Sequence, residues 1–278
     1  MHSRLGFRLT SFLCALVCTT VPALSGIAAS KEIPTVTIVA ADYEFRGPDR
    51  IPAGLTTIEI VNAGEDLHHV QLVQLAPGKS LADFNAEFKA TSKLPPWVRF
   101  AGGPNAVVPG ERAIATVNLD PADYLLLCLI PTETGAPHFI LGMVKPLQVM
   151  GPAMKVPPMP TGGTTIRMLD FGFGIVPPIT AGTHAIHVRN DGDLPHEVVV
   201  VQLTPDTSIN DFGDFAAKRT GPPPGKPMGG MVGLDGGREG SFTATFQPGK
   251  YGIICFFPDP DSGAPHFRRG MLSEFTVE

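Results

Sequence analysis

An internal repeat is the feature that most constrains how this chain can fold. The run Val70–Leu75 (VQLVQL) returns as Val198–Leu203 (VVVVQL), at an offset of 128 residues. Gly135–Phe139 (GAPHF) likewise returns as Gly263–Phe267 with the same five residues. Each copy is the size of a domain, whereas stacked repeats of the solenoid kind are shorter and need at least three copies. The sequence therefore predicts a tandem duplication of one domain.

Short runs rich in β-branched residues, each bounded by Gly, Pro, Asn or Asp, fill both copies, and this pattern is typical of strands. The 31 glycines and 29 prolines agree with many turns. In the first copy the expected strands are Thr35–Ala40, Thr57–Asn62, Val70–Leu75, Ala113–Leu119 and Tyr124–Leu129.

One helix is expected in each copy. Ser80 with Asp83, and Ser208 with Asp211, have the spacing of a capping box that opens a short helix. About seven strands and one helix in a domain of this size favour a Greek-key sandwich. We therefore predict an all-β fold of two tandem Greek-key β-sandwiches, each with a short helical excursion.

The ends of these domains follow from composition. Residues 1–29 read as a signal peptide: Arg4 and Arg8 precede an apolar stretch, and small residues lead to a cleavage site near Ala29. That stretch is too short for a membrane span. The first domain is expected at residues 30–150, a Pro/Gly-rich linker at 151–163 and the second domain at 164–278. The signal predicts a periplasmic or secreted protein.

The repeat also selects among the polar residues. Of the eight histidines, only two positions recur in both copies, and a cysteine and a methionine recur with them. His69 is replaced by Glu197 in the second copy, and His184 and His187 have no histidine counterpart, so these three are not expected to bind a metal. The candidate metal ligands are His68, Cys128, His138 and Met143 in the first copy, and His196, Cys255, His266 and Met271 in the second.

Two imidazoles and a thiolate with a weak thioether are the ligand set that suits copper cycling between two oxidation states. His68 is expected at the start of one strand and Cys128 at the end of another, and the loop that follows brings His138 and Met143 back to the same end of the sandwich. The sequence thus predicts two copper ions per chain, one in each domain.

Other interpretations of these residues stay open. Cys128 and Cys255 could form a disulfide if two equivalent points of the domains approached within about 7 Å. The fold could also lack metal, or the two methionines could be core residues. Zinc is a poor match, because its sites are built from Cys, His and carboxylate ligands.

The arrangement resembles the cupredoxin family, whose members carry a type 1 copper site. The resemblance rests on a His after an Asn-containing turn, a Tyr-x3-Cys segment and a loop that ends in His-x4-Met. The residues that carry it are Asn62, His68, Tyr124, Cys128, His138 and Met143, with Asn190, His196, Tyr251, Cys255, His266 and Met271 in the second copy. The resemblance implies that the His, Cys and Met residues are copper ligands. The long Cys–His loops are similar to the type 1 site of copper nitrite reductases.

The residues next to the cysteines in the sequence disfavour copper catalysis. Where nitrite reductases carry a His for a second copper, this chain has Leu127 and Ile254, and it has no His-x-His or His-Cys-His. An electron carrier is therefore expected rather than an enzyme. Copper storage or delivery and a structural role are the alternatives, and a multicopper oxidoreductase is the least favoured.

The partners of such a carrier are only partly constrained. A net charge of −5 does not favour nucleic acid. The redox partner protein is not identified by the sequence, and an oligomer stays open. Pro137, Phe139, Pro265 and Phe267 are expected to form apolar patches around partly exposed His138 and His266, through which electrons would enter.

Overall fold

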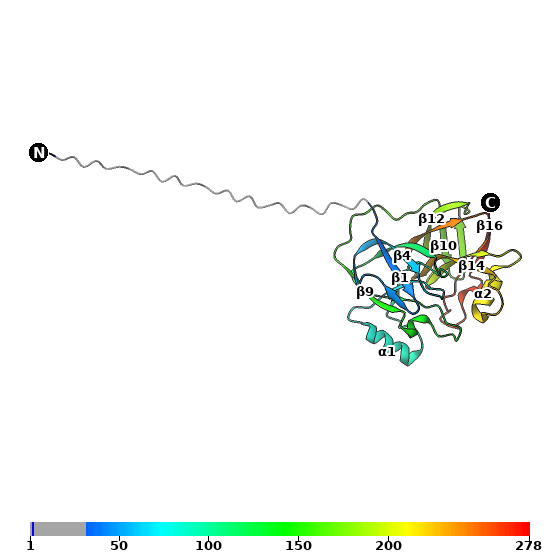
Figure 1. Ribbon diagram of the computed structural model, residues 1–278, viewed down its shortest axis with the longest axis horizontal. Coiled ribbons are helices and arrows are strands. Elements are labelled where there is room, and N and C mark those ends of the chain that lie inside the picture. The colour runs from blue at the N-terminus through cyan, green and yellow to red at the C-terminus, as the bar shows by residue number, and fades with distance from the viewer. Residues whose placement is uncertain (1, 3–31) are drawn as a thin grey trace.

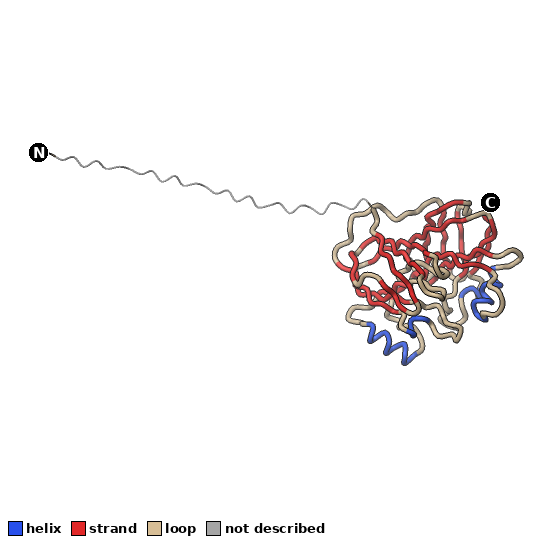
Figure 2. Tube along the Cα trace, viewed as in Figure 1, coloured by secondary structure: helices blue, strands red, loops and turns tan. Residues whose placement is uncertain are grey.

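The computed structural model describes residue 2 and residues 32–278, so the predicted signal peptide lies, apart from His2, outside the described residues. Strands make up most of the regular structure (Figure 2). The first half contains β1 (Thr35–Ala41), β2 (Glu44–Arg46), β3 (Arg50–Pro52), β4 (Gly54–Asn62), β5 (Gln71–Gln74), α1 (Leu81–Thr91), β6 (Arg99–Phe100), β7 (Arg112–Leu119), β8 (Ala122–Leu127), the 3-10 helix η1 (His138–Leu141) and β9 (Val144–Met150). The second half contains β10 (Thr164–Leu169), β11 (Gly172–Val176), β12 (Gly182–Asn190), β13 (His196–Leu203), α2 (Ile209–Lys218), β14 (Gly225–Leu234), β15 (Glu239–Phe246), β16 (Gly249–Ile254), η2 (His266–Arg269) and β17 (Leu272–Val277).

Each half is a β-sandwich. In the first, the order β2-β1-β4-β7 forms one layer and β3-β9-β8-β5-β6 forms the other. In the second, the layers are β11-β10-β12-β15 and β14-β13-β16-β17. Apolar side chains from both layers, such as Ile58 and Leu126, belong to one buried cluster. The predicted all-β fold with two Greek-key sandwiches and one short α-helix in each is confirmed (Figure 1).

The local sequence accounts for these elements. Along β4, buried and partly exposed residues alternate, as expected of a strand with one face on the core. Helix α1 begins at a capping box in which Ser80 Oγ accepts the Asp83 N–H and the Asp83 carboxylate accepts the Ser80 N–H. Ser208 and Asp211 cap α2 in the same way, so both predicted helix starts are confirmed. Strand β8 ends at Leu127, before the predicted end, because the backbone of Cys128 bonds to the loop that follows.

The two sandwiches share a sheet. Strands β7 and β15 pair antiparallel, which joins one layer of each half into a single sheet of eight strands. In this pairing Ala115 lies opposite Phe242, its own counterpart in the repeat. A second set of backbone contacts joins the segments 100–107 and 228–235, where Pro104 lies opposite its counterpart Met231. The halves are therefore related by a local two-fold axis that passes close to these two pairs.

Two glycines beside this axis permit close backbone approach within each half. Gly103 has φ +135°, and a Cβ atom on it would lie 2.2 Å from the Val70 carbonyl oxygen. Its counterpart Gly230 has φ +120°, and a Cβ atom there would lie 2.1 Å from the Val198 carbonyl oxygen. No other residue type fits either position without moving the backbone. Glycine thus lets each of the two segments that meet at the axis pack closely on its own sandwich.

The segment 153–162 between the halves contains no helix or strand, and most of its residues are exposed. Among residues 32–278, no helix has both the length and the apolar character needed to cross a membrane.

Candidate metal centres

The structure brings His68, Cys128 and His138 together, although they lie on different segments. Cys128 Sγ lies 3.9 Å from His68 Nδ1 and 3.6 Å from His138 Nδ1, and the two Nδ1 atoms are 3.2 Å apart. All three side chains are buried. We call this group, with Met143 beside it, the first centre.

The second half repeats this geometry at His196, Cys255 and His266. Cys255 Sγ lies 3.6 Å from His266 Nδ1, and the Nδ1 atoms of His196 and His266 are 3.0 Å apart. We call this group, with Met271, the second centre. Among the described residues these are the two places where three His, Cys, Asp or Glu ligand atoms converge within 4.8 Å.

These distances fit one metal ion in each centre. An ion about 2.0 Å from each nitrogen and about 2.3 Å from sulfur, in a trigonal plane, keeps its ligand atoms about 3.5–3.8 Å apart. The measured separations of 3.0–3.9 Å are close to this range. Cys128 and Cys255 are both free thiols, so the disulfide alternative is not realised.

The ligand loop is held by its own backbone. Cys128 N–H donates to the Met143 carbonyl oxygen, and Met143 N–H donates to the His138 carbonyl oxygen. The same two bonds join Cys255, Met271 and His266 at matching distances of 3.2 and 3.1 Å. Each methionine is therefore fixed next to its cysteine and fully buried. Backbone hydrogen bonds thus hold the loop, as they hold paired strands, and a site of defined geometry requires such support.

The helices fasten this loop to the sandwich. Phe139, which follows the ligand His138, packs against Phe84 and Phe88 of α1 with ring centroids 5.8 and 4.8 Å apart. Phe267 packs over Gly213 of α2, where a Cβ atom would lie 2.7 Å from its ring. In Figure 1 the two helices lie on the same side of the molecule, each beside its own half.

The expected apolar patch is wrong for its two phenylalanines and for the exposure of its histidines, whereas Pro137 and Pro265 are partly exposed. His138 and His266 are each only 1% exposed, and Phe139 and Phe267 are buried because the helices cover them. Tyr43 and Phe171 cover the imidazoles, with ring centroids 4.7 Å from His138 and 5.2 Å from His266. The two residues that follow each phenylalanine are exposed: Ile140 and Leu141 in the first half, and Arg268 and Arg269 in the second.

Two aspartates that sequence reasoning missed orient the first histidine of each centre. His68 Nε2 lies 2.5 Å from Asp42 Oδ1, and His196 Nε2 lies 2.8 Å from Asp170 Oδ1. A proton shared with the carboxylate at Nε2 leaves the Nδ1 lone pair free to bind a metal. Asp42 and Asp170 recur at the repeat offset, so the signal was present in the sequence.

A buried asparagine holds the turn before each of these histidines. Asn62 Nδ2 donates to the carbonyl oxygens of Asp66 and Val107, and its Oδ1 accepts the Gly64 N–H. Asn190 makes the equivalent three bonds in the second half. The Asn of the sequence motif therefore positions the turn that leads to His68 or His196.

Burial opposes charge on the cysteine of each centre and on the histidine of its loop. It is the main cause that lowers the pKa of His138 and of His266 to about 4, with the neighbouring histidine of each centre adding to the effect. Burial also raises the pKa of the Cys128 thiol to about 12 and that of Cys255 above its ordinary value. Metal binding must then displace a proton from each thiol, which couples loading to pH.

One buried neighbour differs between the centres. His69 Nε2 accepts the N–H of Leu129, the residue after Cys128, at 2.8 Å. Glu197 Oε1 accepts the N–H of Phe256, the residue after Cys255, at 2.9 Å. Burial lowers the pKa of His69 to about 3 and raises the pKa of Glu197 to about 7. His69 thus serves as a hydrogen-bond acceptor for the backbone after Cys128.

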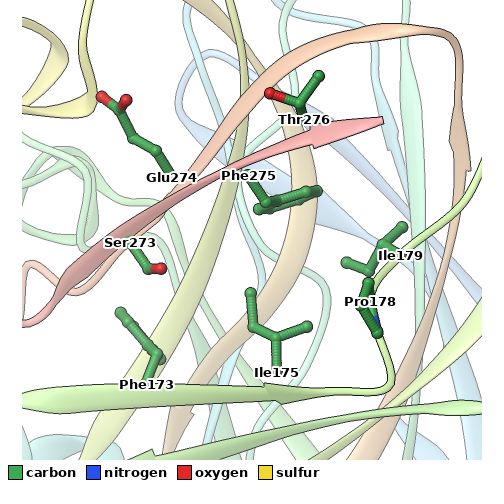
Figure 3. A pocket seen from close by; sticks show the side chains of 8 residues that line it. All are labelled: Phe173, Ile175, Pro178, Ile179, Ser273, Glu274, Phe275 and Thr276. Atoms are coloured by element: carbon green, nitrogen blue, oxygen red, sulfur yellow. The ribbon is translucent and has the colours of Figure 1, made fainter. Parts of the chain in front are cut away.

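Other residues singled out earlier lie away from the centres. His184 and His187 both lie on β12. His184 bonds to Thr180, and His187 bonds to Glu239 of β15. Leu127 and Ile254, which precede the cysteines, are buried and apolar. A pocket at the outer edge of the second sandwich (Figure 3) contains no candidate ligand; it is lined by Phe173, Ile175, Pro178, Ile179, Ser273, Glu274, Phe275 and Thr276.

Removing either aspartate is expected to weaken copper binding at its own centre. Asn at position 42 offers one oxygen, whereas Asp42 accepts from both the His68 ring and the Glu65 N–H. We therefore expect Asp42→Asn to lower copper affinity at the first centre about 10–100-fold, as is usual when such a partner of a metal-binding His is lost. A chelator competition titration measures this. Asp49→Asn, on an exposed carboxylate that pairs with Lys145, is the matched control, and equal affinities of the two variants would refute the role of Asp42.

Comparisons with known proteins give the following. No family model and no curated protein matches the chain. Among solved structures, the reduced auracyanin of Roseiflexus castenholzii is 17% identical and covers 43% of this chain and 99% of its own, with a TM-score of 0.31. Auracyanin A, a "blue" copper protein of Chloroflexus aurantiacus, is 21% identical and covers 42% and 98%, with a TM-score of 0.30. The copper-containing nitrite reductase of Thermus scotoductus is 12% identical and covers 90% and 62%, with a TM-score of 0.25. In residue types and mutual distances, the two His–Cys–His groups of this chain resemble type 1 copper sites.

Proposed function

We propose that this protein binds two copper ions and carries single electrons. The ligands would be His68, Cys128, His138 and Met143 at the first centre, and His196, Cys255, His266 and Met271 at the second. The observation that carries the proposal is the twofold occurrence of a buried group with two nitrogens and one sulfur, held by the same backbone bonds. Nitrogen and thiolate in a plane with a weak thioether suit one-electron chemistry at copper.

The bound copper would supply the change between two oxidation states, and the chain would supply rigidity and exclusion of water. The ligand atoms already converge without metal, and the loops that carry them are fixed at Cys, Met and His. A site that changes little on loading also changes little on gain or loss of an electron. This favours electron transfer over storage or delivery, which need exchangeable metal.

The proposal extends to the setting of the protein. The predicted signal peptide, with cleavage near Ala29, supports a periplasmic or secreted location. The domain boundaries at 30–150 and 164–278, with the linker at 151–163, belong to the same proposal. The partner would be a redox protein, with no role for nucleic acid.

The test is to express the mature chain, load it with Cu(II), and record its visible spectrum and copper content. We expect an intense thiolate-to-copper band, two coppers per chain and reversible one-electron voltammetry. A loaded protein without that band, or one that forms an intrachain disulfide in place of binding copper, would sink the proposal. Loading with Zn(II) is the control, since zinc has no redox change and gives no visible band.

A further inference from the structure

The two centres have the same ligands but different buried neighbours. His69 and Glu197 occupy the same place in the repeat and make the same bond, to the N–H that follows the cysteine. His69 and Glu197 are both only 6% exposed. A ring nitrogen thus accepts the N–H after Cys128, whereas a carboxylate oxygen accepts the N–H after Cys255.

Asn105 lies close to the local two-fold axis, next to both His69 and Glu197. Its Nδ2 donates to Glu197 Oε2 at 3.0 Å and to the carbonyl oxygens of Val198 and Met231, all across the interface. The residue at the equivalent place in the second half is Val232, which has no polar side chain. A hydrogen-bonded carboxylate therefore has its support at the second centre alone.

The carboxylate acts on the cysteine beside it. Both oxygens of the buried Glu197 side chain accept hydrogen bonds, from the Phe256 N–H and from Asn105 Nδ2, which favours the ionised carboxylate beside Cys255, whereas the ring of His69 accepts one bond beside Cys128. Charges interact strongly in a buried, weakly polarisable environment. A negative charge stabilises a divalent copper more than a monovalent one, so it lowers the reduction potential of a nearby site.

We propose that His69 and Glu197 hold the two centres at different reduction potentials, with the second centre lower than the first. This inference rests on the proposed function. One electron delivered to the fully oxidised protein by its redox partner protein would then be held by copper at the first centre, and the second centre would stay oxidised. At equilibrium, a singly reduced protein would therefore hold its electron mainly at the first centre.

The experiment isolates each centre and then changes its neighbour. Cys255→Ser leaves the first centre and Cys128→Ser leaves the second, and the potential of each is read from its absorption band at one fixed alkaline pH. At a common electrode potential near the midpoints, we expect the ratio of reduced to oxidised copper to be at least about tenfold lower at the second centre, equivalent to about 59 mV for one electron.

Glu197→Gln then decides the cause, because glutamine keeps an oxygen for the Phe256 N–H but has no charge. We expect it to remove most of the tenfold difference. Glu239→Gln, the same change on an exposed side chain of β15, is the matched control and should leave the ratio unaltered. At the first centre, His69→Glu should lower the ratio of reduced to oxidised copper, and His69→Gln should not.

The outcomes separate the two proposals. Equal potentials of the two single-centre proteins, or a Glu197→Gln shift no larger than that of Glu239→Gln, overturn the inference and leave copper binding intact. Absence of the absorption band in both single-centre proteins overturns the proposed function and the inference with it. If His69→Glu does not fold, the glutamine variant at position 197 still gives the answer.

Discussion

Replacement of Cys128 by serine is expected to remove about half of the visible absorption of the copper-loaded protein, because the band arises from a thiolate bound to copper. Cys128 and Cys255 supply the one thiolate of each centre, and both are fully buried, so no other cysteine of the described chain can take their place. Cys255→Ser should remove the other half, and the double variant should be colourless. The measurement is absorbance per chain after loading, together with copper content.

The control for this experiment is His184→Ala. His184 bonds to Thr180 and lies outside both centres, so its loss should leave the band and the two coppers unchanged. If Cys128→Ser abolished the whole band, the two cysteines would serve one shared site. If it left the band intact, the colour would not come from the first centre.

Substitution of Gly103 by alanine is expected to destabilise the whole molecule. A Cβ atom there would lie 2.2 Å from the Val70 carbonyl oxygen, and the backbone has φ +135°. Strained backbone and overpacking together cost about 3 kcal/mol. For a chain of this size that lowers the melting temperature by about 6–12 °C. Because one core cluster runs through both halves, we expect a single shifted transition in calorimetry.

Gly110→Ala separates the two contributions. Gly110 also has a positive φ, of +79°, but a Cβ atom on it would meet no atom within 4 Å. It should therefore cost only about 1 kcal/mol, from backbone strain alone. Equal melting temperatures for the two variants would show that the close approach of Gly103 to the Val70 carbonyl oxygen contributes nothing to stability.

The repeat made most of the candidate site predictable. Functional positions that both copies share stand out from a background of unshared polar residues, and His68 was separated from His69 in this way. Asp42 and Asp170 were also shared, but their role depends on a contact between segments 26 residues apart, which spacing alone does not reveal.

Contacts across the two-fold axis could not be predicted. Asn105 and Glu197 lie in different copies and have no counterparts of the same type, so comparison of the two copies does not single them out. The apolar patch was predicted wrongly for a related reason. Phe139 follows a ligand, which suggested exposure, but α1 packs over it, and the sequence does not tell which face of the sandwich a helix will cover.

The sheet shared by β7 and β15 has a consequence for the origin of the chain. Each half alone would present an open strand edge at this place, and open edges pair with other chains. Two identical halves joined about a two-fold axis form a symmetric dimer, in which every contact occurs twice. The present molecule is such a dimer made continuous by a connecting segment. With both halves on one chain, a residue of one half can change while its equivalent in the other half stays the same. Two equivalent sites can then become different.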